Sequence, residues 1–298
     1  MNDPRHEPAA IGMAFVRSPG GVDPFYSEVI AGMEDVLHPR GMRVLMQTVP
    51  TVADEAVVYR RWAQTSAVAG IVISDLTVDD PRAALLTSLG VLHVTLGEPE
   101  DAAGGSVVRV DNYTTMVRAV QQLAALGHRV IGRVSGPEQL LHTQTRSVAF
   151  ADAIAGAGAV GHTTVGDYSA VSGAAGIHDL LARSEPPTAV LFDNDMMAVA
   201  GLDAAQRAGL SVPADLSVLA WDDSTLCRLA SPPLSAMSHD VRELGSLAAT
   251  ALLTVIGGGE PQDVTAPLAE FIARGSTTVP PAPPAGGAQI TPSTTAYP

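Results

Sequence analysis

The chain has 298 residues, 46% of them hydrophobic, which is enough for about two domains with sizeable cores. It has no run of about 18 apolar residues and no visible secretory signal, so we expect a cytoplasmic protein with no membrane contact. The net charge of −14 repels a phosphate backbone and argues against non-specific DNA binding by the chain itself. The single cysteine, Cys227, excludes an intrachain disulfide and a cysteine-based zinc cluster.

Apolar, β-branched runs alternate with amphipathic stretches from residue 11 to about 255. Strands that are apolar almost throughout are typical of parallel sheets covered by helices, so the alternation predicts an α/β, doubly wound architecture. We expect strands at 11–16, 43–47, 70–73, 91–96, 106–110, 130–134, 163–166, 189–192 and 217–221. We expect helices at about 24–39, 53–66, 79–89, 112–126, 144–156, 170–183, 195–208 and 240–256.

Local signals at the ends of these elements support the assignment. Asp195, or Asp193 just before it, suits an N-cap for the helix through Ala208. Residues 279–298 contain six prolines and no charged residue, so we expect a disordered or extended tail. The first ten residues are expected to be a linker or disordered.

The catalytic and cofactor motifs that we examined give no support for an enzyme. Gly156, Gly158 and Gly161 spell G-x-G-x-x-G, but after a predicted helix and before a strand, the reverse of a dinucleotide loop. There is no G-x-S-x-G elbow, and without lysine there is no phosphate-binding loop of the G-x-x-x-x-G-K type. No two of the eight histidines have metal-ligand spacing on a helix. We therefore expect no enzyme, no metal and no cofactor.

Polar and aromatic side chains follow the predicted strands, at the edge where open α/β sheets bind ligands. An aromatic ring can stack on the apolar face of a sugar, while carboxylate, amide and guanidinium groups bind its hydroxyls. Taken singly, each residue has another reading as a turn or rim residue. The set comprises Phe25, Tyr26, Ser74, Asp75, Arg146, Tyr168, Asn194, Asp222 and Asp223.

Four stretches carry a resemblance to a known family. They are IGMAFVRSPGGVDPFYSEVIAGM (11–33), VDNYTTMVRAVQQLAALGHRVIGRVSGP (110–137), PTAVLFDNDMMAVAGLDAAQRAGLSVPADLSVLAWDD (187–223) and SPPLSAMSHDVRELG (231–245). In these stretches the chain resembles the effector-binding domain of the lactose-repressor (LacI/GalR) family of bacterial transcription regulators, over roughly residues 11–275.

This resemblance implies two subdomains of type I periplasmic binding protein architecture, joined by three crossovers near Asp111, near Met237 and near 260–264. The N-terminal subdomain would hold 11–110 plus about 238–260. The C-terminal subdomain would hold 111–237 plus about 261–275. The effector would bind in the cleft between them.

The resemblance also implies roles for individual residues. The family's key arginine aligns with Arg146, its ligand asparagine with Asn194 and its ligand aspartate with Asp222. Its stacking aromatic residue aligns with Tyr168. The implied ligand-binding set is completed by Phe25 and Asp75 from the first subdomain and by His142 and His239 at cleft-facing positions.

Two of the departures from the family pattern bear on the expected function. Gly97-Glu98 stands where the family often has Asp-Arg, which removes one ligand carboxylate, so the sugar cannot be carried over from a relative. Family members also usually begin with a helix-turn-helix, which residues 1–10 cannot form. We expect either a truncated repressor or a stand-alone effector domain.

The sequence therefore predicts a homodimeric domain that senses a small molecule, and that acts on operator DNA only through a missing N-terminal helix-turn-helix. A sugar or sugar derivative is the expected effector, with a nucleobase or nucleoside as the second choice. The alternative is a stand-alone or periplasmic sugar-binding protein with the same fold.

Overall fold

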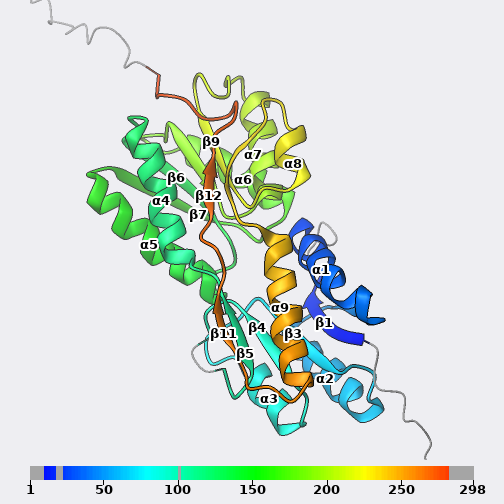
Figure 1. The fold of residues 1–298 in the computed structure, drawn as a ribbon. Helices are drawn as coiled ribbons and strands as arrows, with labels where there is room; N and C mark the ends of the chain where they lie inside the picture. The colour runs from blue at the N-terminus through cyan, green and yellow to red at the C-terminus, as the bar shows by residue number, and fades with distance from the viewer. Residues whose placement is uncertain (1–9, 18–22, 100–101, 282–298) are drawn as a thin grey trace, which may run out of the picture.

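The computed structural model describes residues 10–17, 23–99 and 102–281. These residues form two lobes, each built on a six-stranded sheet with helices on both faces (Figure 1). The predicted α/β class with two doubly wound sheets is confirmed. Of the linker expected at 1–10, residues 1–9 lie outside the described residues, and Ala10 is instead the first residue of a strand. Of the tail expected at 279–298, residues 282–298 lie outside the described residues.

The first lobe contains a fully parallel sheet with the strand order β11-β5-β4-β3-β1-β2. Its strands are β1 (Ala10–Val16), β2 (Arg43–Val49), β3 (Gly70–Ile73), β4 (His93–Leu96), β5 (Ser106–Arg109) and β11 (Asp263–Thr265). Its helices are α1 (Pro24–Leu37), the short 3₁₀ helix η1 (His38–Arg40), α2 (Val52–Thr65), α3 (Arg82–Ser88) and α9 (Val241–Ile256).

The second lobe repeats this arrangement with the strand order β12-β10-β9-β8-β6-β7, in which only the β10–β12 pair is antiparallel. Its strands are β6 (Val130–Ser135), β7 (Val160–Val165), β8 (Ala189–Phe192), β9 (Ser217–Trp221), β10 (Ser235–Ser238) and β12 (Glu270–Ile272). Its helices are α4 (Asn112–Ala125), α5 (Leu141–Ala157), α6 (Ala170–Leu181), α7 (Asp195–Arg207) and α8 (Thr225–Leu229).

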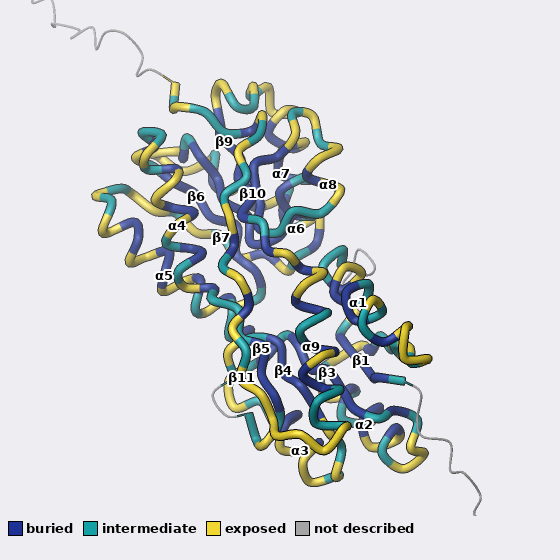
Figure 2. Tube along the Cα trace, in the orientation of Figure 1, coloured by how far each residue is buried: buried dark blue, intermediate teal, exposed yellow. Residues whose placement is uncertain are grey.

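Each sheet is buried between two helical layers, and the central strands are dark along their length in Figure 2. The period of two along β1 shows why: Ile11, Met13 and Phe15 pack into the core under α1 and α9, while Ala14 packs into the core under α2 and α3. In the second lobe, α6 and α7 cover one face and α4 and α5 the other. No helix in the described residues combines the length and apolar character needed to cross a membrane.

Two glycines allow α1 and α9 to pack backbone against backbone. A Cβ on Gly32 would lie 1.7 Å from the carbonyl oxygen of Arg242, and a Cβ on Gly245 would lie 2.0 Å from that of Val29. Both distances are far inside van der Waals contact. Helix α9, although distant in sequence, is therefore a close-fitting part of the first lobe.

The chain passes between the lobes three times. The first passage precedes α4 and the second lies between Ser238 and Val241, close to the positions expected from the sequence. The third was expected near 260–264, but Asp263–Thr265 still pairs with β5 in the first sheet, so the chain crosses between Thr265 and Glu270. The assignment of 261–265 to the C-terminal subdomain is therefore wrong.

Three smaller sequence expectations need correction. Strand β7 begins at Val160 rather than at 163, and the strands β10, β11 and β12 were not predicted. The N-cap of α7 is neither Asp193 nor Asp195 but Asn194, whose side chain accepts from the backbone N–H of Met197 at 2.9 Å. The glycine-rich segment at 156–161 is a helix-to-strand turn, as predicted, with Gly158 at a φ of 58°.

Candidate functional site

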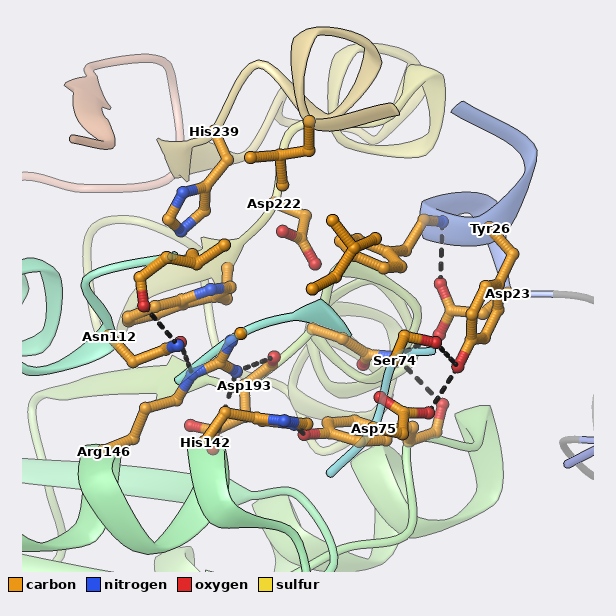
Figure 3. A pocket seen from close by; sticks show the side chains of 18 residues that line it. Asp23, Tyr26, Ser74, Asp75, Asn112, His142, Arg146, Asp193, Asp222 and His239 are labelled. Atoms are coloured by element: carbon orange, nitrogen blue, oxygen red, sulfur yellow. Dashed lines mark hydrogen bonds and ion pairs between the residues drawn. The ribbon is translucent and has the colours of Figure 1, made fainter. Parts of the chain in front are cut away.

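A pocket lies between the lobes, where the carboxyl ends of both sheets meet (Figure 3). Its cavity volume is about 110 Å³, several times the roughly 10–15 Å³ that one water molecule needs. All eight residues predicted from the sequence line it: Phe25, Asp75, His142, Arg146, Tyr168, Asn194, Asp222 and His239. The structure thus brings these eight residues to one place, which we call the central pocket. Tyr26 and Ser74, which were also candidates, line it too, whereas the candidate Asp223 does not.

Stacked rings and a carboxylate form the wall from the first lobe. Tyr26 stacks on Phe15 with 3.9 Å between ring centroids and 4° between planes. The Tyr26 hydroxyl donates to the Asp75 carboxylate and lies 3.4 Å from the Ser74 hydroxyl. Since this ring is fully packed, Tyr26 orients Asp75 rather than offering a free face to a ligand.

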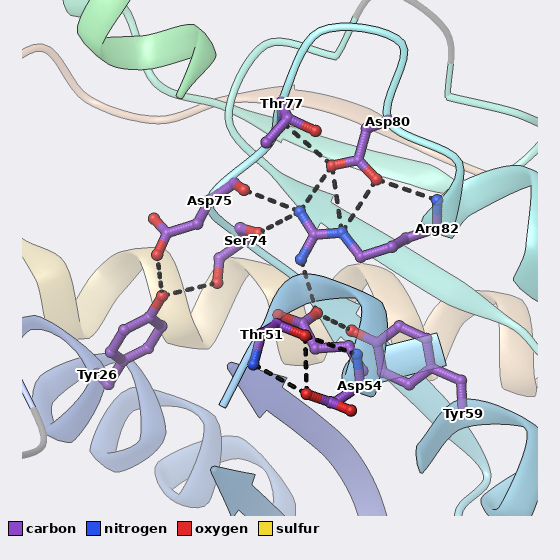
Figure 4. Close-up of polar contacts among 10 residues, drawn as sticks. Tyr26, Thr51, Asp54, Tyr59, Ser74, Asp75, Thr77, Asp80 and Arg82 are labelled. Carbon is purple, nitrogen blue, oxygen red and sulfur yellow. Dashed lines mark hydrogen bonds and ion pairs between the residues drawn. The ribbon is translucent and has the colours of Figure 1, made fainter. Parts of the chain in front are cut away.

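A buried arginine supports this wall from behind (Figure 4). Arg82 is 2% exposed and donates to the carbonyl oxygens of Ser74 and Asp75, both at 2.8 Å. Its charge is balanced by Glu55 at 2.7 Å and Asp80 at 2.7 Å. This cluster therefore fixes the backbone turn that aims Asp75 at the pocket.

Three pocket residues have left-handed backbone conformations without being glycine. The φ angles are 51° at Asp75, 67° at Tyr168 and 66° at Asp222. Such conformations are costly for residues with a Cβ and concentrate at functional sites. The observation supports a binding role for the three strand ends and explains how their side chains turn into the cleft.

Arg146 is held on the floor of the pocket by the second lobe. Its Nε donates to the Asn112 side-chain oxygen at 2.9 Å and its Nη1 donates to the Asp193 carbonyl at 2.9 Å. The guanidinium lies 4.0 Å from the ring centroid of Trp221. Among the described residues, Nη2 has no hydrogen-bond partner, so it is available to a ligand oxygen.

Behind Arg146 lies a fully buried ion pair. Arg133 and Asp193 are both 0% exposed in their side chains and are joined by two hydrogen bonds of 2.8 and 2.6 Å. Asp193 also accepts from the backbone N–H of Gly136 at 3.2 Å. The Arg133 guanidinium holds the pKa of Asp193 below its ordinary value against the effect of burial.

Hydrogen bonds also join the two lobes across the cleft. Asn194 donates to the carboxylate of Asp23, the N-cap of α1, at 3.2 Å. Beside the pocket, the backbone N–H of Leu141 donates to the carbonyl of Leu76 at 2.8 Å. The lobes are therefore in direct polar contact at two separate points.

Asp23 should give the protein a specific pH dependence. Burial raises its pKa from 3.8 to about 6, so the folded state holds this proton more tightly than the unfolded state. As the pH rises from about 4 to about 6, ionisation of this carboxyl group therefore lowers the free energy of unfolding progressively. In Asp23→Asn, which keeps an oxygen able to accept from Phe25 and Asn194, that cost should disappear.

We expect the variant to become more stable relative to the natural chain as the pH rises through this window. Denaturant unfolding of both proteins at intervals from pH 4 to 7 measures the difference. A difference that stays constant across these pH values would contradict the assignment.

Several polar groups of the pocket have no partner in the described residues. They are both ring nitrogens of His239, which is 8% exposed, the Nε1 of Trp221 and the carboxylate of Asp222. Burial raises the pKa of Asp222 well above its ordinary value and lowers that of His239 to about 3. The imidazole is thus neutral, and these groups are free to bond to a ligand.

His142 and Tyr168 form a second polar edge, with 2.7 Å between Nε2 and the hydroxyl oxygen. Burial and the nearby Arg146 lower the pKa of His142 to about 4, so this ring is neutral as well.

Within the described part of the chain, no group of three or more His, Cys, Asp or Glu side chains could hold a metal ion.

Among the polar and aromatic residues that line the pocket, the sequence prediction omitted Asp23, Asn112, Asp193 and Trp221. The clearest available signal was Arg133, a charged residue inside an apolar strand. A buried arginine requires a partner, and the carboxylates at the end of the neighbouring strand β8 were candidates. Asp23 and Asn112 gave no comparable signal because each also fits a helix start.

Residues 120–277 match the sequence model of a known protein family, the periplasmic binding protein-like domain. The regulator CelR of Thermobifida fusca is 30% identical over 246 residues, covering 79% of this chain and 71% of CelR. The chain belongs to the LacI family of transcriptional regulators. The relatives are regulators, which agrees with the expectation that this chain is not an enzyme.

Other LacI-family members extend the match in sequence and in three dimensions. The repressor CytR of Escherichia coli K12 is 28% identical over 265 residues, 86% of this chain and 76% of CytR. A LacI-family regulator from Bifidobacterium animalis superposes with a TM-score of 0.84 at 31% identity, covering 93% of this chain and all of that one. A solved structure of the regulator CelR in a complex with cellobiose superposes with a TM-score of 0.81 at 26% identity, over 92% of this chain and 86% of the chain in that structure.

Proposed function

We propose that this chain is the sensing part of a LacI-family regulator and that its effector is a sugar or sugar derivative bound in the central pocket. The observation that carries the proposal is the set of polar groups without partners in the described part of the central pocket, which includes Trp221 Nε1 and both His239 ring nitrogens, in the pocket that Asp222 and Arg146 also line. Ring faces and paired donors and acceptors are the chemistry of polyol recognition. The cellobiose bound by CelR supports the same class of ligand.

The proposed mechanism uses the two lobes as subdomains. Residues of the central pocket come from both sheets, so a ligand that bridges them favours one relative position of the lobes over another. In a homodimer this change alters the spacing of two DNA-binding headpieces on a pseudo-palindromic operator. A coupling of about 1–3 kcal/mol between effector and operator is typical of such regulation. We place this activity in the cytoplasm.

A thermal-shift screen of the purified chain tests the proposal, with pentoses, hexoses, disaccharides, sugar phosphates and nucleobases as ligands. A ligand at about 100 times its dissociation constant stabilises the folded state by roughly 2.7 kcal/mol, which is a readily measured shift. We expect a shift with at least one sugar. A shift only with a nucleobase would replace the sugar by the second choice, and no shift across the panel would refute the assignment of a sugar effector.

A further inference from the structure

A second cavity lies beside the central pocket and has a volume of about 430 Å³. It is bounded by the second and third passages between the lobes and by the adjoining ends of α1 and α8. Three residues line both spaces: Phe25, Asp222 and His239. The second cavity, which we call the side cavity, is therefore a neighbour of the central pocket across a shared wall.

The shared wall contains the groups that lack partners. The side chain of His239 is buried, with only 8% exposed, and neither of its ring nitrogens has a hydrogen-bond partner in the described residues. A neutral imidazole presents one donor and one acceptor, and Asp222 beside it presents acceptors. Hydroxyl groups both donate and accept, so a polyol passing this wall satisfies both residues.

The charge around the side cavity argues against an anionic ligand. Besides Asp222, whose pKa burial raises well above the ordinary value, its lining acidic residues are Glu28, Asp195, Asp223, Asp240 and Glu270. The two lining arginines are already paired, Arg242 with Asp35 at 2.6 Å and Arg228 with Asp223 at 3.9 Å. A phosphate or carboxylate on the ligand would meet repulsion without an available cation.

We propose that the effector is an uncharged molecule of two linked polyhydroxylated units, such as a disaccharide. One unit occupies the central pocket beside the Nη2 of Arg146, the linkage passes His239 and Asp222, and the second unit occupies the side cavity. This inference rests on the proposed function and makes it narrower. A single ring would leave the larger of the two spaces without a ligand and would contact only one side of the shared wall.

Calorimetric titration tests the inference with cellobiose, maltose, lactose, sucrose and trehalose, their component monosaccharides and glucose 6-phosphate. We expect at least one disaccharide to bind 100-fold more tightly than either of its components, and no binding of the sugar phosphate. Monosaccharides binding as tightly as every disaccharide, or tightest binding by the phosphate, would overturn the inference while leaving a sugar sensor in place. No binding by any of these sugars would overturn both this inference and the proposed sugar effector.

Two substitutions that fill the side cavity test its role directly. Leu268→Trp acts from the third passage, where Leu268 is half-buried, and Glu28→Trp acts from the exposed side of α1. We expect each to weaken disaccharide binding at least 10-fold and to leave monosaccharide binding unchanged. Leu92→Trp is the matched control. Leu92 is 40% exposed and directly precedes β4, so it lies at the amino-terminal end of this strand, whereas the cavities lie at the carboxyl ends. Unchanged disaccharide affinity in both folded cavity variants would overturn the inference.

Discussion

Replacing Asp193 by asparagine should lower the free energy of unfolding by about 3–5 kcal/mol, the cost of leaving a buried cation without its anion. Arg133 is fully buried and depends on this carboxylate, and Arg146 has the same carboxylate 3.9 Å away. The loss is large because a natural domain has only about 5–15 kcal/mol of stability in total. Urea unfolding monitored by tryptophan fluorescence gives the value.

Asp263→Asn is the matched control, because it removes the carboxylate of an exposed ion pair. Asp263 contacts Arg109 at 2.7 Å, but the two side chains are 55% and 39% exposed, so the loss should be no more than about 1 kcal/mol. A double variant with Arg133→Met and Asp193→Asn should be more stable than Asp193→Asn alone, since it removes the stranded charge. Equal losses in the Asp193 and Asp263 variants would show that burial does not govern the strength of the pair.

Arg146→Gln should reduce effector binding by about 100-fold or more, because truncating a buried, hydrogen-bonded charge costs roughly 2–5 kcal/mol of binding energy. The substitution removes the free Nη2 and the planar fork of the guanidinium. Lysine at the same position restores the charge without the fork, so Arg146→Lys should recover only part of the affinity. The measurement is calorimetric titration with the sugar that gives the largest thermal shift.

The control is Arg118→Gln on the exposed side of α4, which makes the same chemical change away from the pocket. It should leave the dissociation constant unchanged. Because Arg146 also bonds to Asn112 and to the Asp193 carbonyl, its loss should cost some stability, and unfolding curves must show that the variant is folded under the titration conditions. Folded Arg146→Gln with undiminished affinity would place the effector elsewhere.

The long elements were predictable because their patterns are strong. Apolar runs mark the strands at 189–192 and 217–221 directly. The period of the apolar residues marks the helices α7 and α9. Strand β8 also has only four residues, but all of them are apolar, whereas β10 (Ser-Ala-Met-Ser), β11 (Asp-Val-Thr) and β12 (Glu-Phe-Ile) contain no apolar run of that length. The partner of β11 also lies far away in sequence. The position of the third passage could not be predicted for the same reason.

The candidate site was predictable for those residues whose position directly after a strand is enough to bring the side chain into the pocket. The carboxyl ends of parallel strands meet at one edge, so side chains that follow the strands converge whatever the details of packing. Partner choice was not predictable. Asp193, Asn194 and Asp195 are adjacent in sequence, yet one pairs with Arg133, one caps α7 and one bonds to the backbone of Ser224. Only the three-dimensional position of Arg133 separates these roles.

The close backbone contact of α1 with α9 has a consequence for the order of assembly on the ribosome. The first lobe begins at Ala10 but needs α9 and the edge strand β11, so it is completed only after Thr265 has been made. The second lobe has five of its six strands in the continuous stretch from α4 to β10. The first lobe therefore stays incomplete while most of the second lobe is made, and the face of α1 that receives Gly245 stays uncovered until α9 has been synthesised.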